Sequence, residues 1–150
     1  MANPGDALEK ARLAFNVQMA VALGEVGKEI TEEMQDTLTA KDHVDFGDLR
    51  EGLGYLVKRE GEHIKLYGYS NARSPEGVSY AEFLEYGTGI YNPESRRNGE
   101  PWRYKDKHGV WHTTRGMKAD PFIEPAVEKI TKKMDAIVSD VVYNIKQYRR

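Results

Sequence analysis

Apolar residues recur at intervals of three and four through most of the first forty positions of this chain. This period predicts one long amphipathic helix from Asp6 to about Leu38. At about 1.5 Å per residue such a helix reaches roughly 50 Å, which is more than a domain of 150 residues needs for its own core. We therefore expect part of its apolar stripe to face another subunit. The stripe consists of Leu8, Ala11, Phe15, Met19, Ala22, Val26, Ile30, Met34 and Leu38.

The start and the interior of this helix carry further signals. Asp6, with an acidic residue three positions later, has the spacing of a capping box, which would leave Pro4 and Gly5 just outside the helix. Gly24 and Gly27 lie inside it, and each weakens a helix by about 1 kcal/mol relative to Ala. We expect them to mark close packing or a bend.

Shorter elements follow the long helix. Residues of the type that favours strands, on either side of Gly61, predict a hairpin, and an aromatic run that stops at Gly87 predicts about two turns of helix. In chain order we expect a loop at Ala40–Gly47, strands at Tyr55–Glu60 and His63–Tyr69, a polar turn at Ser70–Gly77 and the short helix at Tyr80–Tyr86.

The second half of the chain has a similar make-up. Thr88–Pro101 carries Gly, Pro, Asn and Ser without an apolar period, so we expect a long exposed loop. A second hairpin is predicted from Trp102–Lys105 and Val110–Thr114, with its aromatic residues covering a sheet face. A last amphipathic helix should follow, with Pro125 in its first turn. The aromatic residues of the hairpin are Trp102, Tyr104 and Trp111.

This order of elements predicts an α+β fold in a single domain over residues 1–150. Long N-terminal and C-terminal helices should pack on a small antiparallel sheet of two hairpins, with the long loop exposed. The chain contains no Cys, which excludes disulfides, thiolate metal sites and cysteine nucleophiles. Its start lacks the features of a signal peptide, and no run of about 18 apolar residues predicts a membrane span. We expect a soluble protein in the cytoplasm where it is made.

Charge is distributed unevenly along the chain. Residues 1–62 hold 7 Lys and Arg against 13 Asp and Glu, whereas residues 96–118 hold 7 against 2, although the net charge is only -2. Such a dipolar chain suits stacking against a charged partner better than general nucleic-acid binding, which needs a basic excess.

Two pairs of residues have the spacing of a metal site or a phosphate-binding loop, but each lacks the other residues that such a site needs. His108 and His112 could offer two metal ligands, but Gly109 turns the chain between them and a zinc site needs at least a third ligand. Gly87 and Gly89 are similar to a phosphate-binding loop, but no Gly-Lys-Ser or Gly-Lys-Thr follows. We therefore expect neither a metal site nor a phosphate-binding loop here, and we interpret these glycines as a helix stop and a turn.

Acidic and hydroxyl side chains do not favour catalysis either. Glu82 and Glu85 share one face of the short predicted helix, as paired catalytic acids would, but two acids in this setting usually form a solvated edge. None of the serines lies in the sequence context of a nucleophile elbow. The chain is therefore predicted not to be an enzyme.

One enzymatic alternative stays open. A basic cluster around the second hairpin has the groups with which a metal-independent ribonuclease toxin binds phosphate and moves protons. The same cluster could bind nucleic acid without cleaving it. It consists of Arg96, Arg97, Arg103, Lys105, His108, His112 and Arg115 with Tyr104.

The phrase that begins YAEFLEYGTG at Tyr80, and continues after a polar loop as PWRYKDKHGVWHTTRGMKADPFIEPAVEK to Lys129, resembles a tail-component family of long-tailed bacteriophages. The resemblance is to neck and tail-completion proteins. It is specific from Tyr80 to Lys129 and only architectural over the two long helices. The motif residues that carry it are Glu85, Tyr86, Gly87, Gly89, Trp102, Trp111, Gly116, Pro121, Phe122 and Pro125.

The resemblance implies a structural protein of the virion at the head–tail junction, assembled in the host cytoplasm, with no cofactor. It implies a homo-oligomer, as one subunit of a ring or collar, that contacts adjoining head-completion and tail-terminator or tail-tube proteins. Non-specific contact with genomic DNA is compatible with this role, and a membrane is not involved. The expected contact residues lie on the loop and the basic hairpin and are Tyr91, Arg96, Arg97, Arg103, Lys105 and Lys107.

Overall fold

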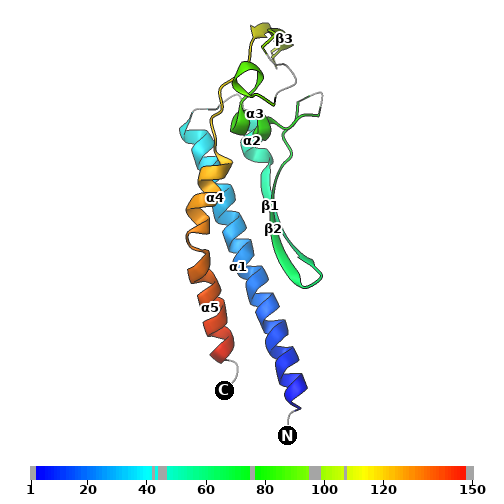
Figure 1. The fold of residues 1–150 in the computed structure, drawn as a ribbon, viewed down its shortest axis with the longest axis vertical. Coiled ribbons are helices and arrows are strands. Elements are labelled where there is room, and N and C mark those ends of the chain that lie inside the picture. The colour runs from blue at the N-terminus through cyan, green and yellow to red at the C-terminus, as the bar shows by residue number, and fades with distance from the viewer. Residues whose placement is uncertain are drawn as a thin grey trace.

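The computed structural model describes residues 3–41, 43, 47–74, 77–94, 99–106 and 108–147. The molecule is elongated, with both termini at one end (Figure 1). Its elements, in chain order, are α1 (Pro4–Ala40), α2 (Gly47–Gly52), β1 (Leu53–Glu60), β2 (His63–Ser70), α3 (Tyr80–Tyr86), a 3-10 turn (Gly89–Tyr91), β3 (Trp102–Lys105), β4 (Trp111–Thr114), α4 (Ile123–Thr131) and α5 (Met134–Gln147).

Helix α1 is continuous over 37 residues, which confirms the prediction from the apolar period. The expected cap is wrong, because Pro4 and Gly5 belong to the first turn and Asn3 is the N-cap residue. The Asn3 side chain accepts a hydrogen bond from the Gly5 N–H at 3.2 Å. Pro4 suits the first helical position because its missing N–H would have no helical partner there.

The hairpin β1–β2 lies along one side of α1, and α4 and α5 lie along another (Figure 1). Close approach of the hairpin depends on Gly27, where a Cβ would lie 2.5 Å from Cδ2 of Tyr55 and 2.7 Å from Cδ1 of Leu66. The expectation of close packing is thus confirmed at Gly27. Gly24 differs, because a Cβ there would meet nothing within 4 Å among the described atoms.

The first predicted hairpin is confirmed. Strands β1 and β2 pair antiparallel from Leu53 opposite Ser70 to Glu60 opposite His63, and Gly61 turns the chain with φ 62°. Helix α2, just before β1, was not predicted. The expected loop that precedes α2 lies largely outside the described residues.

The second hairpin is also confirmed, with Trp102 opposite Thr114 and Lys105 opposite Trp111. The described strands form two separate two-stranded sheets, so the predicted α+β class holds while each hairpin stands alone. The expectation that the three aromatic residues share a face is wrong. Trp102 and Tyr104 lie two residues apart on one face, whereas Trp111 pairs with Lys105 and lies on the other.

The predicted last helix is divided into α4 and α5 by a turn at Lys132 and Lys133. Pro125 does lie in the first turn of α4, as expected. The pair runs antiparallel to α1, and ion pairs tie the elements together. Their distances are 2.5 Å for Lys129 Nζ to Glu33 Oε2 and 2.9 Å for Lys133 Nζ to Glu29 Oε2.

The hydrophobic core gathers at one end of the molecule, where the C-terminal half of α1 meets α2, α3 and the start of α4. Leu49, Leu84 and Phe122 are completely buried there. The N-terminal half of α1 lies outside this cluster, so the molecule has a packed core end and a helical stem. The buried members of the core are Met34, Leu38, Leu49, Ala72, Ala81, Leu84, Phe122 and Ala126.

Candidate functional site

The two halves of the motif phrase, far apart in the sequence, lie against each other at the core end. The segment that ends α3 and the segment that precedes α4 are joined by backbone hydrogen bonds, so the 3-10 turn after α3 is pinned in place. The start of the predicted exposed loop is therefore part of the packed structure. The bonds run from Thr88 N–H to Met117 O at 2.8 Å, from Ile90 N–H to Arg115 O at 3.0 Å and from Asp120 N–H to Leu84 O at 2.8 Å.

Glycines make this close approach possible. Gly89 has φ 60°, and a Cβ there would lie 2.0 Å from the carbonyl oxygen of Arg115. Gly116 has φ 134°, and a Cβ there would lie 2.0 Å from the carbonyl oxygen of Thr88. Both the positive φ and the lack of space therefore exclude a larger residue at these two positions.

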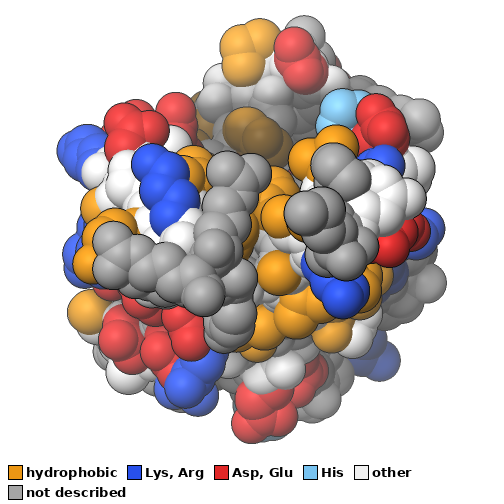
Figure 2. All heavy atoms as spheres, turned by 90° about the horizontal axis from the view of Figure 1, so that it is seen from below, with side chains coloured by type: hydrophobic (Ala, Val, Ile, Leu, Met, Phe, Trp, Pro, Cys, Tyr) orange, Lys and Arg blue, Asp and Glu red, His pale blue; other side chains and the backbone are white. Residues whose placement is uncertain are grey.

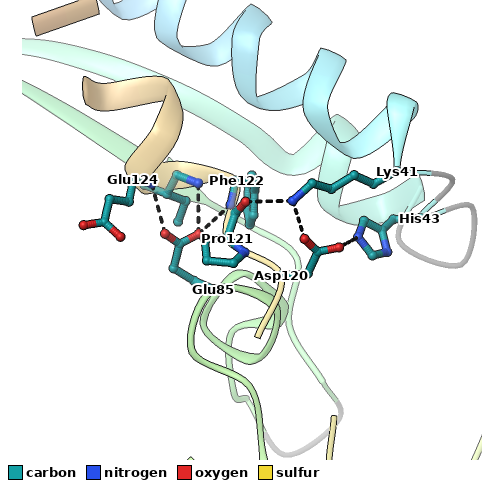
Figure 3. A network of polar contacts seen from close by, with 8 residues as sticks. Lys41, His43, Glu85, Asp120, Pro121, Phe122 and Glu124 are labelled. Carbon is teal, nitrogen blue, oxygen red and sulfur yellow. Dashed lines mark hydrogen bonds and ion pairs between the residues drawn. The ribbon is translucent and has the colours of Figure 1, made fainter. Parts of the chain in front are cut away.

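Glu85 links α3 to the start of α4 (Figure 3). Its carboxylate is buried, with the residue 6% exposed, and it accepts backbone hydrogen bonds from Phe122, Ile123 and Glu124, each at 2.9 Å. The first N–H groups of a helix have no partner within the helix, and the helix dipole favours a negative charge there. Glu85 thus caps α4 from another element. Its interpretation as part of a solvated edge is wrong, whereas Glu82 is exposed.

Asp120 connects the same segment to the C-terminal end of α1 (Figure 3). Its carboxylate forms an ion pair with Lys41, and its Oδ2 lies 3.0 Å from Nε2 of His43. The hydrogen bond from Lys41, followed by that from His43, lowers the pKa of the Asp120 carboxyl below its ordinary value. This residue was not singled out from the sequence, because its partners lie almost eighty positions away.

The basic hairpin presents two cations on one aromatic ring. Cζ of Arg103 lies 5.2 Å, and Nζ of Lys105 5.9 Å, from the ring centroid of Trp111. Trp111 itself is 57% exposed. A cation over an aromatic face is attracted by the negative face of the ring, so the arrangement holds both charges at a solvent-exposed surface.

The other expected contact residues are only partly described. Tyr91 is exposed on the pinned turn, and Nζ of Lys118 lies 5.8 Å from its ring centroid. Arg96, Arg97 and Lys107 lie outside the described residues.

The opposite face of the hairpin carries His112. Its Nε2 lies 2.8 Å from Oδ2 of Asp106, and its ring stacks on that of Tyr104 at 5.2 Å. The hydrogen bond from His112, followed by that from the Val110 backbone, lowers the pKa of the Asp106 carboxyl. Arg103 pairs with Thr113 and so lies on the other face. The described hairpin therefore does not bring together the His and Arg that a ribonuclease site there would use.

The remaining motif residues divide between core and surface. Phe122 is completely buried and Trp102 is half-buried, which places both in the packing. Tyr86 is 65% exposed, and Pro125 is exposed in the first turn of α4. Pro121 is half-buried beside the Lys41 ammonium, which donates a hydrogen bond to its carbonyl oxygen at 3.0 Å.

The acidic side chains in the described part of α1 form no arrangement that resembles a metal centre. A shallow cleft between α1 and α4 is lined by Glu29, Glu33 and Asp36, and two lysines neutralise part of its charge. Within the described ranges, no group of three or more His, Asp or Glu side chains could hold a metal ion. Over the same ranges, no helix is both long and apolar enough to cross a bilayer.

Comparison with known families gives one match. The model of the family described as "Bacteriophage HK97-gp10, putative tail-component" matches residues 5–87, more than half of the chain. The match runs from α1 through α3, so it includes Tyr80–Gly87, the first part of the phrase quoted for the resemblance. No curated protein and no solved structure matches the chain. The resemblance to a phage tail family is confirmed, and the chain belongs to the HK97-gp10-like family of bacteriophage tail components.

Proposed function

We propose that the protein is a structural subunit of the head–tail junction, one that forms a ring or collar and helps to join tail to head. Membership of a tail-component family supports a structural role in the virion. Assembly into a ring is supported by exposed apolar side chains on the stem. Leu13, Val17 and Val21 of α1 are each more than half exposed. Exposed apolar side chains that gather in this way are typical of contact surfaces.

The surfaces for other virion proteins are expected at the opposite end. Arg103 and Lys105 are held over Trp111 at an exposed face, and this combination of cation and aromatic ring suits an acidic protein surface. The proposed partners are the adjoining head-completion and tail-terminator or tail-tube proteins. Contact of the same cations with genomic DNA would be non-specific and strongly salt-dependent.

This function requires no catalysis. Glu85 and Asp120, the carboxylates at the centre of the motif, are engaged in holding helices in place. The proposed role therefore needs no cofactor, and the protein would be made in the host cytoplasm and end in the virion.

The proposal is tested by deleting the gene from the phage that encodes it and supplying the protein from a plasmid. Without the protein, electron microscopy should find full heads and tails that are not joined, and the wild-type protein should restore joined particles. Arg103→Glu with Lys105→Glu should restore few of them. Lys58→Glu with Arg59→Glu, which reverses two exposed cations on β1, is the matched control and should restore most. Normally joined particles in the absence of the protein would refute the proposal.

A further inference from the structure

The exposed apolar residues of α1 form a continuous ridge. Leu13, Val17 and Val21 follow one another at intervals of four residues, and they are 61%, 56% and 60% exposed. Residues four apart on a helix lie side by side and form the ridges through which helices pack. Figure 2, which views the end that carries both termini, shows hydrophobic side chains gathered there between acidic and basic ones. We call these three residues the α1 ridge.

A second, smaller ridge lies on α5. Val138 and Val142 are also four residues apart, and they are 39% and 38% exposed. They flank the side of α5 that packs on α1, where Val141 is buried and Ile145 is half-buried. We call Val138 and Val142 the α5 ridge.

The two ridges overlap in height along the stem at Val21. The helices run antiparallel, and Lys129 and Lys133 pair with Glu33 and Glu29, so each step forward along α5 corresponds to an equal step backward along α1. This register places the α5 ridge level with about Ala20 to Gly24, beside the upper part of the α1 ridge. In a ring of parallel subunits the surfaces that meet must lie at the same height. Val21 satisfies that condition with Val142, whereas Val17 and Leu13 lie further towards the terminal end of the stem.

Charge at the upper end of each ridge is complementary. Lys28 lies seven residues beyond Val21 on the same side of α1, and it is exposed, with a long ion pair of 3.7 Å to Glu32. Asp135 lies one turn before Val138 on α5 and is exposed. When the ridges of two copies meet at equal height, the ammonium of Lys28 faces the carboxylate of Asp135.

We propose that the α1 ridge of one subunit docks on the α5 ridge of a second copy of this chain, with Lys28 of one copy facing Asp135 of the other. The contact is heterologous: the two surfaces differ, each subunit presents both, and repetition closes a ring. This inference rests on the proposed function, since it names the contact by which the junction ring is built.

The absence of Cys from the chain makes cross-linking a direct test. Particles are assembled with the double variant Val21→Cys and Val142→Cys and treated with a short bismaleimide. We expect a ladder of covalent oligomers up to the full ring. The matched control is Val21→Cys with Tyr143→Cys, because Tyr143 is the next residue, is 63% exposed and points about 100° away around α5. It should give at most a trace of ladder.

Each other outcome contradicts the proposal. A dimer from Val21→Cys alone would mean that two α1 ridges meet across a two-fold axis, and equal ladders from both double variants would mean that the contact does not select the α5 ridge. Joined particles that contain the double variant but give no ladder would overturn this contact and leave the junction role intact. Joined particles that lack the protein would overturn both.

Charge reversal gives an independent readout. Lys28→Glu and Asp135→Lys should each lower the yield of joined particles at least tenfold, and the two together should restore it to within about threefold of wild type. Failure of the double reversal to restore particles, with both single variants folded by circular dichroism, would exclude the proposed charge pair.

Discussion

The Glu85 carboxylate and the backbone N–H of Phe122 are 37 positions apart in the chain and form a buried hydrogen bond of 2.9 Å. Because the same carboxylate also accepts from the next two N–H groups, Glu85→Ala would leave the start of α4 without a cap. We expect a loss of about 3 kcal/mol in the free energy of unfolding, measured with urea. Glu85→Gln should lose less, since its amide oxygen can still accept. Glu82→Ala is the control and should change stability by at most about 0.5 kcal/mol; an equal loss from it would contradict the capping role.

Gly116 should tolerate no side chain. Gly116→Ala places a Cβ 2.0 Å from the Thr88 carbonyl at φ 134°, so we expect a protein that fails to give a cooperative thermal transition. Gly61→Ala is the matched control, because Gly61 also has a positive φ but its Cβ would have open space. That variant should lose only about 1 kcal/mol. Cooperative unfolding of Gly116→Ala near the wild-type midpoint would show that the two segments can separate without cost.

The two glycines within α1 should respond in opposite directions to the same substitution. Gly24→Ala gains helix propensity without a contact and should raise the free energy of unfolding by up to about 1 kcal/mol. Gly27→Ala gains the same propensity but forces Tyr55 and Leu66 away, so it should lower stability by about 1–3 kcal/mol. Urea denaturation of both variants measures the difference. Stabilisation by both would mean that the hairpin does not pack closely on α1.

Asp120 should make stability depend on acid pH. Its pKa is lowered in the folded protein, chiefly by Lys41, so the stability it contributes is present above the unfolded pKa of about 3.9 and is lost as pH falls through the folded value. The difference in unfolding free energy between wild type and Asp120→Asn should therefore be largest near pH 7 and shrink towards about pH 2.

Lys41→Met removes the largest cause of that pKa shift and should weaken the same pH dependence. Urea denaturation of the three proteins across this pH range provides the measurement. A difference between wild type and Asp120→Asn that stays constant from pH 7 to pH 2 would contradict the assignment.

Elements with a local cause could be predicted from the sequence. The period of α1, the glycine at the end of α3 and the turn at Gly61 depend on neighbouring residues, and these elements are present as expected. Helix α2 could not be predicted, because six residues are too few to show an apolar period. The turn at Lys132 and Lys133 could not be predicted either, because it contains neither Gly nor Pro.

The site was harder to predict because its contacts are not local. Glu85 and its helix partners are separated by the whole second hairpin, and nothing near Glu85 in the sequence indicates that N–H groups would surround it. Trp111 and Trp102 lie on different faces of the hairpin because of the register of β3 and β4, and a shift of one residue would reverse the face of Trp111. The motif phrase therefore grouped Glu85, Trp102 and Trp111, but it did not predict the contacts that each of them makes.

The separation of a packed core end from a helical stem has a consequence for genetics. A polar residue in place of Val17 or Val21 replaces a side chain that is already mostly in water, so the isolated protein should still be made, dissolve and unfold normally. A screen for loss of soluble expression will then detect defects at Gly116 or Glu85 but will miss polar substitutions at Val17 and Val21. Only selection for infectious particles can detect lesions at these two positions.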